Sequence, residues 1–396
     1  VSTQINGALD STAAQIGDLL VELSHKIHAN PEVAFEEFKA SRWTADILSN
    51  ANYDVAFGVA EMETAYVATI GNGDLEVAIC AEYDALPDVG HACGHNIIAA
   101  AAIGAGLILA PLVEDLGLKL SVMGTPAEEG GGGKILMLNA GLFESIDLSM
   151  MVHPAPSEFD RMPCVAAQHL EVEFLGKESH AAAFPQLGIN ALDAMTISQV
   201  AIGLLRQSLY PGEMIHGFIT HGGEAPNIIP ARTAADYIAR AETLNQLKTL
   251  VPRIRRCFEA GAIGTGSELK FIHKFEAYSE FITDETLAAI YRREAVASGR
   301  TISTSPTPAM RASTDMANVS MAIPSIHPIL GIDSLPAVNH QPEFTAACIT
   351  QSADKAVVQG ALAMARTIAA VASDQTLRAE FINGKKRIAL RQQMAS

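Results

Sequence analysis

Residues 75–113 read LEVAICAEYDALPDVGHACGHNIIAAAAIGAGLILAPLV, and this stretch decides the fold. Its first nine residues, Leu75–Tyr83, form an apolar, extended run that predicts a strand. A polar loop follows. The segment Ile97–Val113 then predicts a buried helix, because it is rich in Ala and Gly and falls short of the roughly 20 residues needed to span a bilayer. A strand, a loop and a helix in this order are typical of a parallel sheet.

The same alternation continues along the next forty residues. Strands are predicted over Leu118–Met123 and Leu148–Val152, with a helix over Lys134–Ala140 between them. Each predicted strand ends in polar residues, and ligand sites of parallel sheets lie beyond the carboxyl ends of the strands. We therefore expect the α/β class, with a mainly parallel-sheet catalytic domain in an α/β/α arrangement.

The middle of the chain has a different character and predicts an inserted, smaller α+β domain over residues 166–278. The larger domain then comprises residues 1–165 and 279–396, resuming with a helix near Asp284 and ending with a helix over Ala346–Ala372. The strand–helix–strand–helix–strand order of the insertion is predicted for Val165–Leu175, Ala191–Ser208, Ala234–Ala241, Leu244–Ala260 and Glu268–Ala277.

Composition excludes several classes of protein. The 396 residues are 49% hydrophobic, which is too apolar for a disordered chain. The net charge of -17 repels phosphate backbones and anionic lipids, so we expect neither nucleic acid nor membrane as a partner. The five cysteines show no closely spaced framework and the N-terminus resembles no secretory signal, so we expect free thiols in a cytoplasmic protein.

A set of metal-binding residue types stands at the predicted strand ends. Cys93 and His95 occur in HACGHN just before a helix, and this pair alone could equally be a packed thiol beside a hydrogen-bonded histidine. Together with Glu129, His153 and the late His340, it forms a donor set suited to zinc or manganese. We therefore predict a metal site at this edge of the sheet.

The adjacent Glu128 and Glu129 suggest two roles at such a site. Neighbouring loop residues point in different directions, so one carboxylate can bind metal while the other serves as general base and then as acid. The alternative is a solvated acidic pair at a helix start. The four glycines that follow favour the first interpretation, because they permit close backbone approach. This segment is no phosphate-binding loop, because Ile135 stands where Ser or Thr is needed.

Four other residues are candidates with a structural alternative. Asp84 in EYDALP either orients a ligating histidine or forms the turn before a proline-containing loop. His180, Asn227 and Arg232 lie in the inserted domain and could bind a substrate carboxylate or a developing oxyanion. Otherwise, His180 is a structural histidine.

Seven segments, in order, resemble those of the aminoacylase-like metallopeptidase family, between about residues 20 and 372. The nearest branch contains the aminobenzoyl-glutamate hydrolases and related N-acyl-amino-acid and dipeptide amidohydrolases. The segments are IHANPEVAFEE, AEYDALPDVGHACGHN, GTPAEEGGGGK, MVHP, ESHAAAFPQLGINALDA, APNIIPA and VNHQPEFTAAC.

The resemblance implies a two-metal catalytic domain and an inserted lid domain that mediates homodimerisation or higher self-association. Carried over by position, Cys93 bridges two divalent ions, and His95, Glu129, His153 and His340 complete their ligands. Zinc or manganese is expected, with cobalt or nickel as further options. Glu128 is then the general base, and His180 is the lid histidine that reaches an active site in its own subunit or its partner's.

One position departs from that pattern. Many relatives have Asp directly after the second histidine of HACGH, where this chain has Asn96.

The resemblance implies hydrolysis of the amide bond of an N-acyl amino acid, an aminobenzoyl-glutamate-like conjugate or a dipeptide by a water that two metals activate. The alternatives are a deaminase-like C–N hydrolase acting on an aromatic amine and a non-catalytic metal-dependent binding protein.

Overall fold

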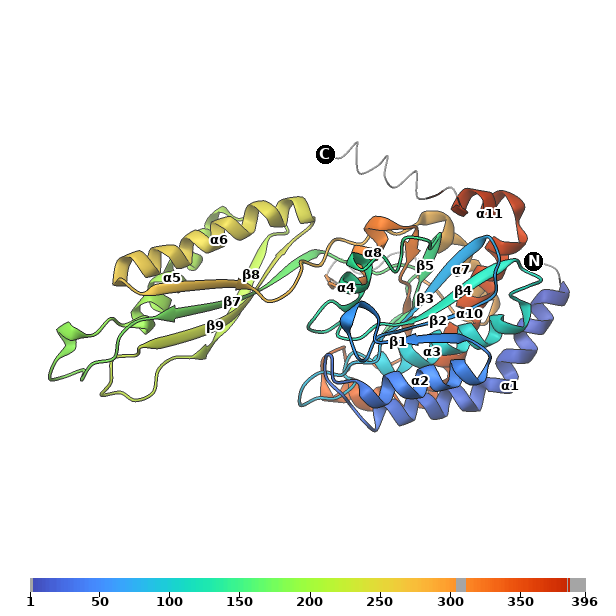
Figure 1. Ribbon diagram of the computed structural model, residues 1–396, viewed down its shortest axis with the longest axis horizontal. Coiled ribbons are helices and arrows are strands. Elements are labelled where there is room, and N and C mark those ends of the chain that lie inside the picture. Colours follow the sequence, from blue (N-terminus) through green and yellow to red (C-terminus); the bar gives the residue numbers. More distant parts are fainter. Residues whose placement is uncertain (1–2, 304–310, 383, 385–396) are drawn as a thin grey trace. The chain divides into compact units, whose positions relative to one another are not determined.

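The computed structural model describes residues 3–303, 311–382 and 384, and the chain divides into two compact units (Figure 1). The first unit comprises Val1–Pro163 and Phe281–Ser396, and the second comprises Cys164–Glu280. These bounds lie two residues from the boundaries that the sequence suggested. The role of the second unit as a lid or dimerisation domain stays a prediction.

The first unit is built on a six-stranded sheet in the order β1-β2-β4-β3-β5-β11. Neighbours among β4, β3, β5 and β11 pair in parallel, whereas β1 and β2 form an antiparallel edge beside β4. The prediction of a mainly parallel sheet is therefore confirmed. The strands are β1 (Asp54–Phe57), β2 (Tyr66–Ile70), β3 (Leu75–Ala81), β4 (Leu118–Gly124), β5 (Leu148–Met150) and β11 (Ser325–Ile326).

Successive side chains of β3 point to opposite faces of the sheet, and both faces are covered. Val77 and Ile79 belong to one apolar core, whereas Ala78 and Cys80 belong to another on the opposite face. The first core includes helices α1 (Thr3–His28), α2 (Phe38–Asn50), α3 (His95–Leu109) and α10 (Gln351–Ser373) (Figure 1). The second includes α4 (Gly133–Asn139) and α8 (Met316–Ala322). The result is the predicted α/β/α arrangement.

The remaining elements of this unit are short or lie at its margins. Strands β6 (His153–Ala155) and β12 (Ile329–Gly331) form a separate parallel pair. Helix α7 (Glu285–Ala297) packs on α10, and α11 (Gln375–Ile382) follows α10. Single 3-10 turns occupy Val59–Glu61 and Ala110–Leu112.

The predicted helix over Ala346–Ala372 is wrong as a single element. Helix α9 (Pro342–Ala347) ends first, and α10 begins afresh at Gln351. Thr350 separates them, because its extended backbone and its side chain, which accepts a hydrogen bond from the Ala353 N–H, form an N-cap.

Two segments are long and apolar enough to cross a membrane by length and composition, namely His95–Leu112 and Gln351–Ser373. Within these windows, 83% and 67% of the residues are buried inside the fold. Helix α3 lies between the sheet and helices α1 and α10, which accounts for its apolar composition. The first segment is thus the buried helix that the sequence predicted.

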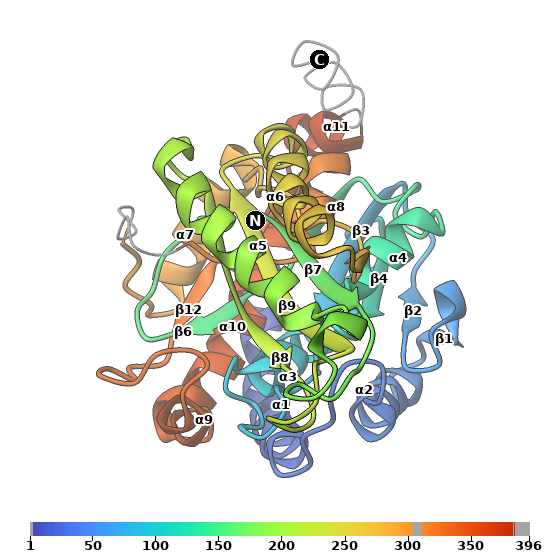
Figure 2. The same ribbon diagram turned by 90° about the vertical axis from the view of Figure 1, so that its left-hand side faces the viewer.

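The second unit is an antiparallel sheet in the order β10-β7-β9-β8, with two helices on one face (Figure 2). Strand β8 was not predicted, because it is an edge strand whose residues are mostly exposed and show no alternation of burial. The elements are β7 (Ala166–Leu175), α5 (Ala191–Leu205), β8 (Met214–His221), β9 (Arg232–Ala241), α6 (Leu244–Thr265) and β10 (Glu268–His273), with 3-10 turns at Pro185–Leu187 and Arg206–Ser208.

Candidate metal centre

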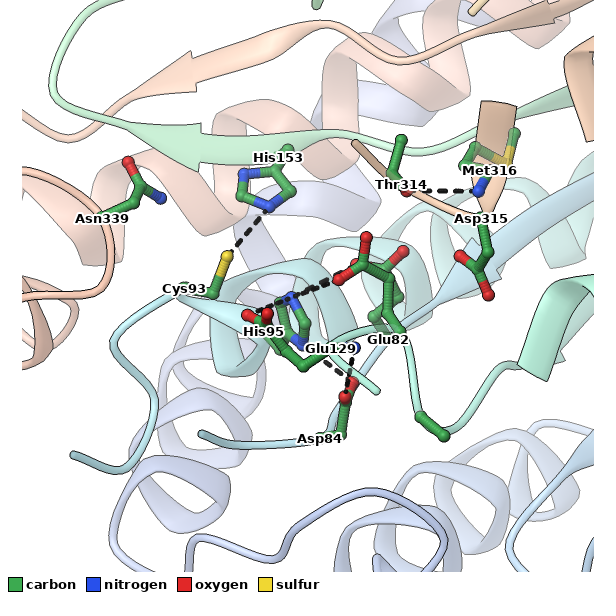
Figure 3. Close-up of polar contacts among 12 residues, drawn as sticks. Glu82, Asp84, Cys93, His95, Glu129, His153, Thr314, Asp315, Met316 and Asn339 are labelled. Carbon is green, nitrogen blue, oxygen red and sulfur yellow. Dashed lines mark hydrogen bonds and ion pairs between the residues drawn. The ribbon is translucent and has the colours of Figure 1, made fainter. Parts of the chain in front are cut away.

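Cys93 and His95 are placed by the turn that starts helix α3. Gly94 between them is the N-cap, with a left-handed φ of 81°. A Cβ at this position would also lie 2.4 Å from Pro154 Cγ, so both the conformation and the close approach require glycine. The turn directs the thiol and the imidazole into the same space beyond the carboxyl end of β3 (Figure 3).

The first group of ligand atoms comes from Cys93, His95 and His153, whose donor atoms all lie within 4.8 Å of one another. Cys93 Sγ is 3.4 Å from His153 Nε2 (Figure 3). His153 Nδ1 lies 2.9 Å from the Pro154 carbonyl oxygen, and a hydrogen bond donated there leaves the Nε2 lone pair toward the thiol. Burial lowers the pKa of His153 to about 4, which keeps the ring neutral as a ligand must be.

The second group comes from Cys93, Glu129 and His340, again with donor atoms within 4.8 Å of one another. Glu129 Oε1 is 3.6 Å from His340 Nε2. His340 has a left-handed φ of 71°, which is unusual for a residue with a Cβ. Its N–H donates to the Ala92 carbonyl at 2.8 Å, so this conformation ties it to the loop that carries Cys93.

Cys93 is common to both groups, so its sulfur can be shared by two ions. The donor set of sulfur, imidazole nitrogen and carboxylate oxygen suits zinc and related divalent metals. His95 Nε2 and Glu129 Oε1 are buried and, within the described part of the chain, have no hydrogen-bond partner. Buried polar atoms without a partner are costly, so the residues present fit a bound cation.

Asp84 orients members of both groups. Its Oδ1 is 2.9 Å from His95 Nδ1, and its Oδ2 accepts the Glu129 backbone N–H at 2.9 Å (Figure 3). Burial would raise the pKa of Asp84, but His95 and these hydrogen bonds hold it below its usual value. An ionised Asp84 fixes the Nδ1–H tautomer of His95 and leaves Nε2 free for a metal. These contacts are the ones that the predicted orienting role requires, and the role itself stays a prediction.

Glu128 lies beside this site, with its Oε2 3.8 Å from His95 Nε2. The preceding Ala127 has a left-handed φ of 60°, and its N–H donates to the buried Glu37 carboxylate at 2.8 Å. Burial and the neighbouring carboxylates of Glu82 and Glu129 raise the pKa of Glu128 well above its usual value. A carboxylate with a raised pKa is suited to accepting and returning a proton.

The glycines after Glu129 are needed for close backbone approach at one position in particular. A Cβ at Gly133 would lie 2.0 Å from the Pro126 carbonyl oxygen, whereas one at Gly130 would meet nothing within 4 Å. Gly133 begins α4, so the chain turns back sharply after the two glutamates. This explains part of the glycine run in structural terms.

Three buried charged residues next to the site were not predicted from the sequence, namely Glu82, Lys134 and Asp315. Glu82 and Asp84 are two residues apart at the end of β3, and this spacing could have indicated Glu82. Lys134 was considered only as part of a rejected phosphate-binding motif, and Asp315 carries no local signal. With Asp84, Glu128 and Glu129, five carboxyl groups lie around Lys134 and His95, so acidic groups outnumber basic ones here, which favours a bound cation.

Two buried histidines, His91 and His327, were also missed. Burial lowers the pKa of His91 to about 3 and that of His327 well below its usual value. The His327 ring centroid is 5.6 Å from that of His153, and neither of its nitrogens has a hydrogen-bond partner among the residues described.

Asn96, which departs from the family pattern, points away from the metal ligands. Its Nδ2 donates to Ser24 Oγ at 2.9 Å and to the Cys348 carbonyl at 3.3 Å. It therefore joins α3 to α1 and to the segment before α10. The residue is an internal tether in this chain.

The three predicted substrate-binding residues belong to the second unit. The structure brings two of them together, because the Ala181 N–H next to His180 donates to the Asn227 carbonyl at 2.9 Å. His180 Nδ1 accepts from the Ala183 N–H at 3.1 Å, which leaves Nε2–H directed outward from an exposed side chain. Arg232 donates instead to Glu173 at 2.5 Å. Their substrate-binding role stays a prediction.

Comparison with known proteins gives one family. Residues 78–370 match the peptidase family M20/M25/M40. The Xaa-Arg dipeptidase of Mus musculus is 36% identical over 379 residues, which cover 91% of this chain and 86% of that protein. One of the subunits of the p-aminobenzoyl-glutamate hydrolase of Escherichia coli is 29% identical over 288 residues, covering 67% of this chain and 60% of that protein.

Among solved structures, a dinuclear metal-binding peptidase from Bacillus subtilis has the same fold. Its TM-score is 0.66 at 19% sequence identity, and the match covers 91% of this chain and 99% of that one.

Proposed function

Because the chain belongs to the peptidase family M20/M25/M40 and therefore hydrolyses amide or peptide bonds, we propose that it works with two divalent ions on N-acyl amino acids or dipeptides. The observation that carries the proposal is the position of Cys93, which contributes to both groups of ligand atoms while Glu128 lies alongside. Zinc is the ion that we favour, because a thiolate with imidazole ligands selects it over harder metals, and manganese is the second choice.

When bound, the divalent ions would lower the pKa of a coordinated water and polarise the amide carbonyl. The protein supplies the proton transfers. Glu128 accepts a proton from the attacking water and later donates one to the departing nitrogen. Asp84 accepts from His95 Nδ1, which leaves Nε2 to face the metal site.

We propose that the amine side of the substrate is an amino acid with a free α-carboxylate. The metal-binding unit is rich in carboxylates, which repel the α-carboxylate of a substrate. Neutral or cationic donors for that carboxylate must therefore come from outside this unit. In the second unit, His180 offers an outward Nε2–H, and the backbone of Asn227 contacts the residue next to His180. The names of the mouse and Escherichia coli relatives both describe amides of an amino acid, which agrees with this proposal.

The decisive experiment combines turnover with metal content. Wild-type protein loaded with zinc or manganese is assayed by free amine release on N-acyl amino acids, aminobenzoyl-glutamate and dipeptides, including one that ends in Arg. Glu128→Gln should keep two ions per chain by elemental analysis while turnover falls by at least about 100-fold, as expected for loss of a general base. Metal loss in step with activity would instead make Glu128 a ligand, and no turnover of any substrate would overturn the proposal.

We further propose that the chain forms a homodimer or larger homo-oligomer through the second unit. Val200 and Leu204 on α5 are 61% and 74% exposed, and Phe218 on the edge strand β8 is 65% exposed. Apolar residues exposed beside an unpaired strand edge favour self-association. Leu204→Glu should then shift the mass in solution toward the monomer.

All five cysteines lie in the described residues and are free, which supports a reducing, cytoplasmic location as a proposal.

A further inference from the structure

A buried lysine lies beside the metal ligands and contacts two carboxylates at once. Lys134 Nζ is 2.5 Å from Glu82 Oε1 and 2.6 Å from Asp315 Oδ1. The Lys134 backbone N–H also donates to Asp315 Oδ2 at 2.8 Å. The three side chains have no exposed surface, so these contacts fix the direction of the Glu82 carboxylate.

The second oxygen of Glu82 faces a metal ligand. Glu82 Oε2 is 3.5 Å from His95 Nε2. His95 Nδ1 donates to Asp84, so Nε2 faces Glu82 Oε2 and can bind a metal ion there once it is deprotonated. Neither Oε2 nor Nε2 has a hydrogen-bond partner in the part of the chain that the structure describes. These two atoms need a cation between them in such a buried place, either a proton on Nε2 or a metal ion that replaces this proton.

We propose that Glu82 is a further ligand of the ion bound at His95, held in place by Lys134 and Asp315. This inference rests on the proposed metal site and adds a carboxylate from the end of strand β3 to it. Donor atoms of Glu82, His95 and Glu128 lie within 4.8 Å of one another. Lys134 holds Oε1 of Glu82, which leaves Oε2 directed toward His95, so Glu82 serves as the ligand.

Lys134 suits the role of anchor because it remains charged. Burial alone would lower the pKa of Lys134, but Asp315 and Glu82 raise it above the usual value. Asp315 binds both the ammonium and the backbone N–H of Lys134, which restrains this long side chain at its two ends. Lys134 uses one oxygen of Glu82 and leaves the other toward His95.

The test measures metal binding directly, with Co²⁺ as the probe. Metal-free full-length protein is titrated with Co²⁺ under chelator competition, and visible absorption reports the ligands around each ion. Glu82→Gln keeps the length of the side chain and removes the charge. Glu82→Asp keeps the charge for Lys134 but withdraws the oxygen from His95. The control is Asp147→Asn. Asp147 is a buried carboxylate that accepts the Glu76 N–H at the amino end of β3, whereas the metal site lies beyond the carboxyl end of this strand.

Both Glu82 variants should bind one of the two ions at least about tenfold more weakly, with a changed Co²⁺ spectrum for that ion only. Asp147→Asn should bind both ions as the wild type does. Wild-type affinity and spectrum in Glu82→Asp would show that Glu82 acts only through its charge and would overturn the ligand assignment. Because Glu82→Asp retains the carboxylate, it decides the question alone if Glu82→Gln does not fold. A wild type that binds no Co²⁺ would instead overturn the proposed function.

Discussion

Asp84→Asn tests whether the buried carboxylate that contacts both ligand groups prepares the site for metal. Asp84 uses one oxygen for His95 Nδ1–H and the other for the Glu129 N–H, each at 2.9 Å. An asparagine side chain has one oxygen and one NH₂ group. In either orientation, a donor therefore meets a donor, and one of the two hydrogen bonds is lost.

The magnitude follows from that lost bond. Leaving one buried donor without a partner costs about 1–3 kcal/mol, and loss of a group that orients a ligand weakens metal binding by about 10–100-fold. We expect the affinity of Asp84→Asn for Zn²⁺ to fall within that range. The other orientation of Asn would favour the wrong His95 tautomer, which acts in the same direction.

The assay is competition between metal-free protein and a chromogenic chelator for Zn²⁺, with circular dichroism to establish that the variant is folded. Asp147→Asn serves as the control, because it removes another buried carboxylate of the same sheet that also accepts a backbone N–H. Zn²⁺ affinity of Asp84→Asn equal to that of wild type would refute the orienting role. An equal loss in both variants would show that buried charge, and not orientation, controls binding.

Three further results are expected. Cys93 should resist iodoacetamide in the metal-loaded protein and react after chelation, as judged by mass spectrometry, because a thiolate bound to two ions is shielded; equal labelling would make it a packed thiol. Replacing the free carboxylate of a good N-acyl amino acid by an amide should lower kcat/KM by about tenfold or more in wild type. His180→Ala should abolish the preference for the free carboxylate. Equal rates on the acid and the amide in wild type would refute the proposal that the enzyme binds this carboxylate. Burial lowers the pKa of His327 well below its usual value, so the unfolded metal-free chain binds a proton near pH 5 that the folded chain does not. The free energy of unfolding should therefore fall as pH drops below about 6.5. His327→Phe should reduce the slope of this free energy against pH by about 1.4 kcal/mol per pH unit. An unchanged slope would contradict the lowered pKa of His327.

Local patterns predicted the elements that carry most of the candidate site. The strand–loop–helix unit around Cys93 was recognisable because its strand is apolar and its helix is Ala-rich. Edge strand β8 was not recognisable, because an edge strand with few buried residues has no alternation to detect. The break before α10 was also missed, since a single Thr350 cap interrupts two apolar stretches that read as one.

The sequence by itself determined which donor types are available and that they stand at strand ends, because parallel strands bring their carboxyl ends to one edge. Tertiary structure alone decided which donors meet. His340 approaches Cys93 only because its N–H reaches the Ala92 carbonyl. Asp315 reaches Lys134 only because α8 packs on α4. These contacts join residues more than 170 positions apart in the sequence, so no local pattern indicates them.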